Sequence, residues 1–336
     1  MSFSDTHRTP CRSLEERSPC PTGRLAPSPT GAQHVGNART YLIAWLSARS
    51  SGGRVVLRIE DIDSPRVKAG ADRQAVEDLL WLGLDWDEGP IVQTGRMEEY
   101  ASALAQLKKR EFVYPCTCTR GDVERAASAP HLEHEGPIYP GLCAENTVGT
   151  AESLGDRPHC WRFRVPVESP SFVDGFVGPT HIDLRQVGGD FVVWKAPRPG
   201  VSGSTPAYQL AVVVDDAAQG VTEGVRGDDL LASTPRQLLL YRALGFKPPS
   251  FAHVPLVVGA DGRRLAKRHG DTRLSSLREA GVRPQLLLGL LAWSCGWLPS
   301  IEPIDARGLL PLFRLETIPR APFVLTPEML KYIGYR

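Results

Sequence analysis

Strand-like and helix-like segments alternate in the first part of the chain, and this alternation constrains the fold more than any other feature. Residues 23–27 are expected to form a short strand that ends at a proline, and a loop connects it to a helix over 35–48. A buried strand over 54–60 follows, and then a helix over 71–82 whose apolar residues recur at helical spacing. Strand–helix–strand–helix order of this kind favours a parallel α/β sheet.

The middle of the chain has a different character. From 112 to 203 it is rich in Pro, Gly and Cys and holds only short strand-like runs. Alternating strand and helix character returns over 207–225, and a helix is expected over Pro235–Leu244. We therefore predict a parallel α/β domain built from 23–111 and 204–258, with 112–203 as an insertion between its halves.

The two ends of the chain differ as well. Residues 1–22 are polar, contain three prolines and show no hydrophobic period, which predicts a disordered arm. Residues 259–336 are expected to form a basic loop and a helical subdomain, with helices over 274–280 and 285–293. The longest apolar run near a helix, Leu286–Trp293, is far too short to span a bilayer.

Length, charge and cysteine usage exclude several classes of protein. The 336 residues, 42% of them apolar, suffice for two or three packed units. The formal net charge is +1, so any nucleic-acid contact must come from a local patch. The N-terminus lacks a secretory apolar segment, and the seven cysteines, an odd number, argue against a disulfide framework. The sequence therefore predicts a soluble, cytoplasmic protein without membrane association.

A stiff loop, APSPTGAQHVGN over 26–37, joins the first predicted strand to the first helix. Gly31 and Gly36 allow a ligand to approach the backbone, and Asn37 or a neighbour can cap the helix. Free N–H groups and the helix dipole attract phosphates, and His34 can donate to a phosphate oxygen. The spacing fits neither a Walker loop nor a dinucleotide G-x-G-x-x-G motif. An ordinary capped helix with an unrelated histidine is the alternative.

A second loop, Leu256–Thr272, is strongly basic. Asp261-Gly262 marks a tight turn within it. Four basic side chains then crowd one stretch: Arg264, Lys267, Arg268 and His269. Lys267 could neutralise charge on a departing pyrophosphate, whereas a solvated basic loop is the alternative.

Together the two loops resemble the signature motifs of class I aminoacyl-tRNA synthetases. His34–Asn37 stands where that class has its HIGH motif, and Arg264–Arg268 stands where it has KMSKS. A sharper resemblance, to the glutamyl-tRNA synthetases, covers nearly everything from Gly23 to the helices after Leu274. The matching stretches are Arg24–Gly31, Leu57–Asp63, Tyr208–Ala211, Val214–Asp216 and Arg226–Leu230. The resemblance implies the Rossmann-like parallel sheet of class I synthetases.

The charges in these stretches suit glutamate as a ligand. Its two carboxylates need cationic partners, and Arg24 and Arg226 fall at the carboxyl edge of the predicted sheet. The resemblance places Glu60 and Tyr208 at the ammonium group. It also implies glutamate contacts from the first loop, at Leu25, Ala26, Pro27 and Ser28. The alternative is that Arg24, Glu60 and Arg226 form an internal ion-pair network.

The reaction that the resemblance implies is attack of the glutamate α-carboxylate on the α-phosphorus of ATP, with loss of magnesium pyrophosphate. Such a step needs positioning and charge neutralisation, and no nucleophilic side chain. His34 and Lys267 are the expected catalytic residues. Gly36 and Asn37 complete, with these two, the expected ATP-binding set, and Mg-ATP is the expected cosubstrate.

Three cysteines gather in the insertion, Cys116 and Cys118 and then Cys143. A segment with little core of its own gains most from a structural zinc, and thiolates prefer zinc to harder ions. Candidates for a fourth ligand are His131, His134, Tyr139 and Cys160. The resemblance selects Tyr139, because C-x-C…Y-x-x-x-C matches the zinc site of the family. Three reduced buried cysteines are the alternative.

The chain stops at Arg336, soon after the first helices beyond the Lys267 loop, where full-length relatives continue with an anticodon-binding region. It thus resembles the branch that attaches glutamate to queuosine in the anticodon of tRNA(Asp). Tyr208–Val212 reads YQLAV, as in that branch, where full-length enzymes typically read YHLAN. Asp216, beside the expected pocket, is a candidate partner of the queuosine group.

We therefore expect a monomer that uses ATP, L-glutamate and queuosine-bearing tRNA(Asp), with tRNA stems contacted by the zinc-containing insertion and by 259–336. Two alternatives stay open. One is a truncated glutamyl-tRNA synthetase that charges the 3′ end of tRNA(Glu). The other is a non-catalytic paralogue that binds tRNA.

Overall fold

The computed structural model describes residues 20–62, 67–126, 138–197, 203–263, 265 and 271–335. Several residues singled out above lie outside these ranges, namely His131, His134, Arg264, Lys267, Arg268 and His269. So does nearly all of the arm expected over 1–22. Thr22, which was included in that arm, belongs to the first strand. The boundary expected from the sequence is therefore wrong by one residue, because proline content hides the start of the strand.

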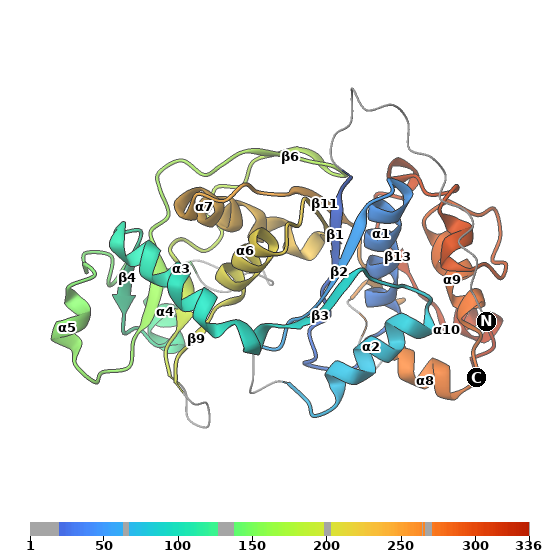
Figure 1. The fold of residues 1–336 in the computed structure, drawn as a ribbon, viewed down its shortest axis with the longest axis horizontal. Coiled ribbons are helices and arrows are strands. Elements are labelled where there is room, and N and C mark those ends of the chain that lie inside the picture. The colour runs from blue at the N-terminus through green and yellow to red at the C-terminus, as the bar shows by residue number, and fades with distance from the viewer. Residues whose placement is uncertain are drawn as a thin grey trace, which may run out of the picture.

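Parallel strands occupy the middle of the molecule, with the insertion on one side and the C-terminal helices on the other (Figure 1). In the first sheet β2 (Arg54–Ile59) lies between β1 (Thr22–Leu25) and β3 (Glu88–Val92), and both pairings are parallel. Helices α1 (Val35–Ser50) and α2 (Ala71–Trp81) connect these strands. The parallel α/β sheet predicted from the order of segments is confirmed.

A second parallel pair, β10 (Glu223–Gly227) and β11 (Ser250–Val254), extends the catalytic half. It is connected through α7 (Thr234–Leu244) and preceded by α6 (Tyr208–Ala218). Residues 208–214, where strand and helix character seemed to alternate, thus belong entirely to a helix.

The two parallel sheets meet at β1 and β10, where the N–H of Thr222 donates to the carbonyl of Thr22 over 2.9 Å. Helix α1 packs against both strands. Its buried Leu42 and Trp45 belong to one hydrophobic core with residues of the C-terminal helices, such as Leu287. The catalytic half and the C-terminal part therefore share a core.

The insertion is built on an antiparallel sheet in the order β4 (Val113–Cys116), β5 (Cys160–Phe163), β8 (Phe191–Lys195) and β9 (Thr205–Pro206). Its pairing extends to Pro206, slightly past the boundary at 203 expected from the sequence. This sheet packs on α3 (Met97–Lys109) and on α6 in a second hydrophobic core.

Smaller elements of the insertion surround this sheet. The hairpin of β6 (Phe172–Asp174) and β7 (Gly178–Thr180) reaches back to the catalytic half, where the N–H of Gly175 donates to the carbonyl of Phe251 on β11. Two short helices, α4 (Arg120–Ala126) and α5 (Thr150–Leu154), lie at the far end (Figure 1).

The C-terminal part begins with α8 (Leu274–Glu279) and α9 (Pro284–Ser294), close to the helices predicted there. After α9 the chain forms only 3₁₀ turns until β13 (Phe323–Val324), which pairs parallel with β12 (Val257–Val258). Helix α10 (Pro327–Tyr332) follows. Uniform helicity was thus an overestimate. The 3₁₀ segments of the described chain are Gln93–Arg96, Asp228–Ser233, Ala306–Leu309 and Leu315–Thr317.

Among the described residues, no helix combines the length and apolar character that a membrane crossing requires. The six cysteines in the described ranges form no disulfide bond with one another. They are Cys20, Cys116, Cys118, Cys143, Cys160 and Cys295.

Candidate active site

A pocket of about 690 Å³ opens where the carboxyl ends of the parallel strands meet the start of α1. Arg24 stands near the end of β1, Glu60 follows β2 and Arg226 lies on β10, and all three line the pocket. Tyr208, the first residue of α6, and His34, before α1, line it too. Residues that lie as much as about two hundred positions apart are thus brought together at the edge where open α/β sheets bind ligands.

Most of the other predicted contacts also reach the pocket. Ala26, Ser28, Gly36 and Asn37 are among its lining residues, together with Leu265 from the second loop. Two predicted glutamate contacts do not line it. The side chain of Leu25 is fully buried in the hydrophobic core, and the carbonyl of Pro27 accepts a hydrogen bond from the N–H of Glu60. Alternation of side chains along β1 explains why Leu25 points to the core while Arg24 points to the pocket.

His34 is the N-cap of α1, so part of its role is structural. Its Nδ1 accepts from the N–H of Gly36 at 3.1 Å and of Asn37 at 3.3 Å. The side chain of Asn37 in turn accepts from the N–H of His34, which completes a capping box. A Cβ at Gly36 would lie 3.0 Å from the imidazole, so glycine makes room for this cap.

The cap changes how the start of α1 can meet a phosphate. The N–H of Val35 already donates to the carbonyl of Thr272, and those of Gly36 and Asn37 donate to His34. The expectation of free N–H groups at this terminus is therefore wrong. Burial lowers the pKa of His34, so the ring is neutral near pH 7 and carries its proton on Nε2. That Nε2–H and the helix dipole remain to meet an anion.

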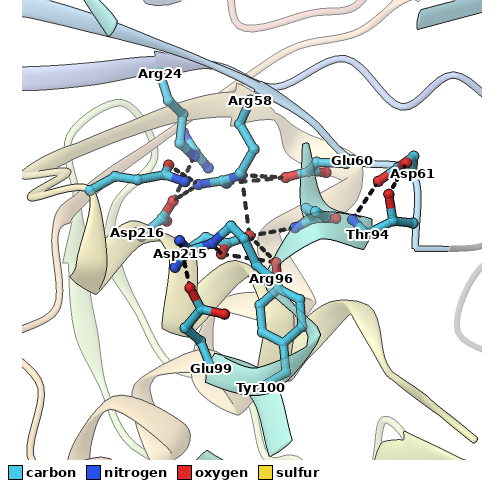
Figure 2. A network of polar contacts seen from close by, with 12 residues as sticks. Arg24, Arg58, Glu60, Asp61, Thr94, Arg96, Glu99, Tyr100, Asp215 and Asp216 are labelled. Carbon is cyan, nitrogen blue, oxygen red and sulfur yellow. Dashed lines mark hydrogen bonds and ion pairs between the residues drawn. The ribbon is translucent and has the colours of Figure 1, made fainter. Parts of the chain in front are cut away.

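Arg58, near the carboxyl end of β2, organises the base of the pocket (Figure 2). Its Nη2 lies 3.1 Å from Glu60 Oε1 and its Nη1 lies 2.8 Å from Asp216 Oδ1. Asp216 also pairs with Arg24, at 3.2 Å from Nε. All four side chains are buried, so one shared network fixes both the cationic and the anionic residue of the pocket.

The network continues beneath the pocket to the neighbouring Asp215. This carboxylate accepts from Gln93, Arg96 and Tyr100, each within 2.9 Å. Figure 2 shows Arg96 and Tyr100 converging on it from the elements that follow β3. Asp215 and Asp216 are both fully buried, and their hydrogen bonds and arginine partners compensate for the burial of their charges.

The pKa values of Glu60 and Asp216 are shifted in opposite directions. Burial raises the pKa of Glu60, and Arg58 and Arg24 only partly oppose this effect. A cation bound beside Glu60 would bring its pKa down again. Burial likewise disfavours charge on Asp216, yet Arg24 and Arg58 hold its pKa below the ordinary value. Asp216 is therefore committed to the arginines, which corrects the idea that it faces the queuosine group.

Comparison with known proteins fits this geometry. The family described as "tRNA synthetases class I (E and Q), catalytic domain" matches residues 22–303. A glutamyl-Q tRNA(Asp) synthetase of Rhodopirellula baltica is 51% identical over 90% of this chain and 93% of its own length. One of Symbiobacterium thermophilum is 49% identical over 92% and 97%.

The chain belongs to the glutamyl-Q tRNA(Asp) synthetase family.

Among solved structures, a glutamate tRNA ligase from Elizabethkingia meningosepticum, in complex with its amino acid, superposes with a TM-score of 0.78. Its sequence is 24% identical, and the match covers 94% of this chain and 69% of the ligase. The class I fold predicted from the two loop motifs is thereby confirmed. In this member of the glutamyl-Q tRNA(Asp) synthetase family, that fold brings together Arg24, Glu60 and Arg226.

The three cysteines predicted to bind a metal do converge in the insertion. The ligand atoms of Cys116, Cys118 and Cys143 all lie within 4.8 Å of one another, and the sulfurs of Cys118 and Cys143 are 3.6 Å apart. The hydroxyl of Tyr139 lies 3.4 Å from the sulfur of Cys116. Zinc–sulfur bonds of about 2.3 Å in a tetrahedron would separate two sulfurs by roughly 3.8 Å. The donor set therefore fits a zinc ion.

Arg162 favours a thiolate at Cys116. Its Nε donates to the sulfur of Cys116 at 3.2 Å, and its guanidinium stacks over the ring of Tyr139. A hydrogen bond with Cys160, and others from Tyr139 and Arg162, lower the pKa of Cys116. The cluster thus consists of three cysteine sulfurs and the phenol of Tyr139, with the positively charged Arg162 beside them.

Sequence reasoning missed the residues that hold the pocket in place. Arg58 and Asp215 are examples in the network, and a second group around Arg226 consists of Asp174, Thr234 and His253. A signal existed for Arg58, which interrupts an apolar strand, because a buried arginine must be paired. No local pattern indicates Asp174, which lies 79 positions from His253.

Proposed function

We propose that the protein activates glutamate with ATP and transfers it to queuosine in the anticodon of tRNA(Asp). The relatives described above carry this activity in their names. The observation that supports it most in the structure is the pocket, whose lining includes Arg24, Arg226, Glu60 and Tyr208. These charges complement an α-amino acid with a second carboxylate.

Each charged group of glutamate has a candidate partner in the pocket. Nη1 of Arg226 is buried without a hydrogen-bond acceptor among the described residues, so it can donate to a ligand carboxylate. Arg24 supplies the second guanidinium. Glu60 and Tyr208 line the same pocket and would receive the ammonium group. Burial raises the pKa of Tyr208, which keeps its hydroxyl protonated as a neutral hydrogen-bonding group.

ATP would bind beside the start of α1, with its phosphates near the Nε2–H of His34. The glutamate α-carboxylate attacks the α-phosphorus, and charge develops on the phosphate oxygens as pyrophosphate leaves. A fixed hydrogen-bond donor and a helix dipole stabilise that charge without reorganisation. Leu265 brings the second loop to the pocket wall, which supports the assignment of the following Lys267 to the leaving pyrophosphate.

The zinc assigned to Cys116, Cys118, Tyr139 and Cys143 is structural in this proposal. The ion would bind in the insertion, within the small third hydrophobic core around Tyr114 and Val123, and not at the pocket. This core is too small to be stable alone, and a metal would fix its loops for RNA contact.

The experiment that tests glutamate activation is ATP–pyrophosphate exchange with purified protein and no RNA. Arg24, Glu60, Tyr208 and Arg226 already line one pocket without RNA, so we expect exchange with glutamate in the absence of tRNA. Glutamine, which lacks the second negative charge, should support little exchange because it leaves one buried arginine unpaired. No exchange with any amino acid would support the non-catalytic alternative, and exchange only after adding tRNA would show that RNA orders the pocket.

A further inference from the structure

A second buried chain of polar contacts runs from the insertion to the pocket, through Asp174, His253 and Arg226. Asp174 Oδ2 lies 2.6 Å from His253 Nδ1. On the other side of the ring, Arg226 Nε donates to His253 Nε2 over 2.9 Å. His253 and Asp174 are each at most 2% exposed, and neither lines the pocket itself.

The contacts of Asp174 fix which nitrogen of His253 carries the proton. Asp174 Oδ1 accepts from the backbone N–H groups of Phe176, Val177 and His253, at 3.0, 2.9 and 3.1 Å. Asp174 is thus an ionised acceptor, so His253 Nδ1 must be the donor of the 2.6 Å contact. His253 Nε2 is then free of a proton and accepts from Arg226.

Arg226 is held on two of its nitrogens by this arrangement. Nε donates to His253, and Nη2 donates to the hydroxyl of Thr234 at 2.8 Å. The guanidinium also stacks on the ring of Phe251. Nη1 alone has no acceptor among the described residues, although it is buried and Arg226 lines the pocket.

We propose that Asp174 and His253 are positioning residues that set the orientation of Arg226 for the carboxylate of the amino-acid substrate. The inference rests on the glutamate activation proposed above and adds to it two residues that do not touch substrate. With the opposite tautomer, an N–H of His253 would face the N–H of Arg226, and the guanidinium would turn from the pocket. Asp174 prevents this, because a carboxylate can only accept.

The origin of Asp174 gives the relay a further consequence. It lies on β6 of the insertion, whereas His253 and Arg226 lie on β11 and β10 of the catalytic half. The insertion therefore contributes to the amino-acid pocket through this relay. Its affinity for glutamate should depend on how the β6–β7 hairpin sits on β11.

Three single substitutions test the relay in the full-length protein, with pyrophosphate exchange as the assay. Asp174→Asn offers an amide to His253 and favours the wrong tautomer. His253→Asn keeps a donor for Asp174 but removes the acceptor for Arg226, whereas His253→Gln can keep that acceptor. We expect the KM for glutamate to rise about tenfold to a hundredfold in Asp174→Asn and His253→Asn, and less in His253→Gln. The KM for ATP and kcat should change far less.

A spectroscopic measurement on the wild-type protein makes the test independent of activity and of variant folding. Long-range ¹⁵N–¹H correlation spectra should show His253 as the Nδ1–H tautomer, with the ring signals assigned through bonds from the backbone amide of His253. An Nε2–H tautomer in the wild type overturns the relay, even if the variants do not fold. Equal glutamate KM values for His253→Asn and His253→Gln would also overturn it. Absence of glutamate-dependent exchange in the wild type would instead refute the proposed function.

Discussion

Arg58 Nη1 lies 2.8 Å from Asp216 Oδ1, and through this contact one arginine links both charged sides of the pocket. Arg58 also pairs with Glu60, and Asp216 also pairs with Arg24. Arg58 thus positions Glu60, the expected partner of the substrate ammonium group. Through Asp216 it also positions Arg24, an expected partner of a substrate carboxylate. A change at Arg58 should disturb substrate binding without removing any group that touches substrate.

We predict that Arg58→Lys raises the KM for glutamate and destabilises the fold. Lysine cannot reach Glu60 and Asp216 at once, and Asp215 and Asp216 would stay buried with too few partners. The expected loss of unfolding free energy is about 3 kcal/mol, measured by urea unfolding. Arg54→Lys is the matched control on the same strand. Arg54 and its partner Glu88 are both exposed, so its effect should stay within about 0.5 kcal/mol. Equal effects of the two changes would contradict this role of Arg58.

The sequence alone predicted some of the pocket residues and missed others. Arg24 and Arg226 were predictable because each stands at a strand end and in a stretch that resembles a known family. Arg58 has the same chemistry, but its role depends on partners 158 positions away, which no local spacing reveals. His253 depends likewise on Asp174 in a separate hairpin. Local patterns predicted the sheet and the residues that face the ligand, whereas the buried partners depend on tertiary contacts.

The start of α1 teaches a related lesson. The loop and the helix were predictable from Gly, Pro and the apolar spacing. That His34 itself caps the helix was not, because Ser, Thr, Asp and Asn are the usual caps. The cap uses the very N–H groups that were expected to bind phosphate. The helix cap and the expected phosphate site both require the N–H groups of Gly36 and Asn37, and in the structure the cap uses them.

We predict that His34→Ala and His34→Asn lower turnover alike but affect stability differently. Both remove the Nε2–H donor, which should lower the kcat of exchange about a hundredfold. Asparagine can still cap α1, whereas alanine cannot, so only His34→Ala should lose about 1 kcal/mol of unfolding free energy. The KM for glutamate should change little in either variant. Normal turnover in His34→Asn would show that His34 is only a cap.

We predict that Asp78 makes the protein less stable as the pH rises from about 4 to about 6. Asp78 is fully buried on α2, and both of its carboxylate oxygens lack a hydrogen-bond donor among the described residues. Burial raises its pKa to about 6, so the folded state holds a proton that the unfolded state has lost. This destabilisation is absent below pH 4, and it is complete above the folded-state pKa, where it amounts to about 3 kcal/mol.

Asp78→Asn should therefore be the more stable protein at pH 7.5 and should lose this pH dependence. Urea unfolding at pH 5 and pH 7.5 measures both effects. Asp72→Asn is the matched control, because Asp72 is an exposed aspartate on the same helix. It should leave the pH dependence unchanged. A wild-type protein that gains stability between pH 5 and pH 7.5, by an amount that Asp78→Asn removes, would reverse the predicted sign.

We predict one zinc ion per chain, bound through Cys116, Cys118, Tyr139 and Cys143. Elemental analysis of protein purified without added metal should give this stoichiometry. Cys118→Ser should abolish zinc retention and lower the melting temperature, while glutamate-dependent exchange is largely kept because the pocket lies in the other part of the fold. Tyr139→Phe should weaken retention, and Cys160→Ser should not. The opposite order for these two would assign the fourth ligand to Cys160.

The acceptor of glutamate is the final prediction, and we expect it to be the queuosine ring of tRNA(Asp). Queuosine carries a cyclopentenediol whose two hydroxyls resemble the ribose diol that ordinary synthetases acylate, so one adenylate chemistry serves both. Anticodon loops present unstacked bases that proteins can splay out and read at their edges. The pocket opens at the sheet edge and is not enclosed within either core, which allows a loop to approach the adenylate.

The deciding experiment charges three RNAs with labelled glutamate: tRNA(Asp) with queuosine, tRNA(Asp) with guanosine at that position, and tRNA(Glu). We expect only the first to be labelled. Periodate cleaves both diols and cannot separate the routes, so each RNA is also prepared without its 3′-terminal adenosine. Labelling of queuosine-bearing tRNA(Asp) should survive that removal, and nuclease digestion should leave the label on the anticodon fragment. If tRNA(Glu) is labelled instead, and loses the label when its terminal adenosine is removed, the acceptor is the 3′ end. The protein would then charge tRNA(Glu) as a glutamyl-tRNA synthetase does.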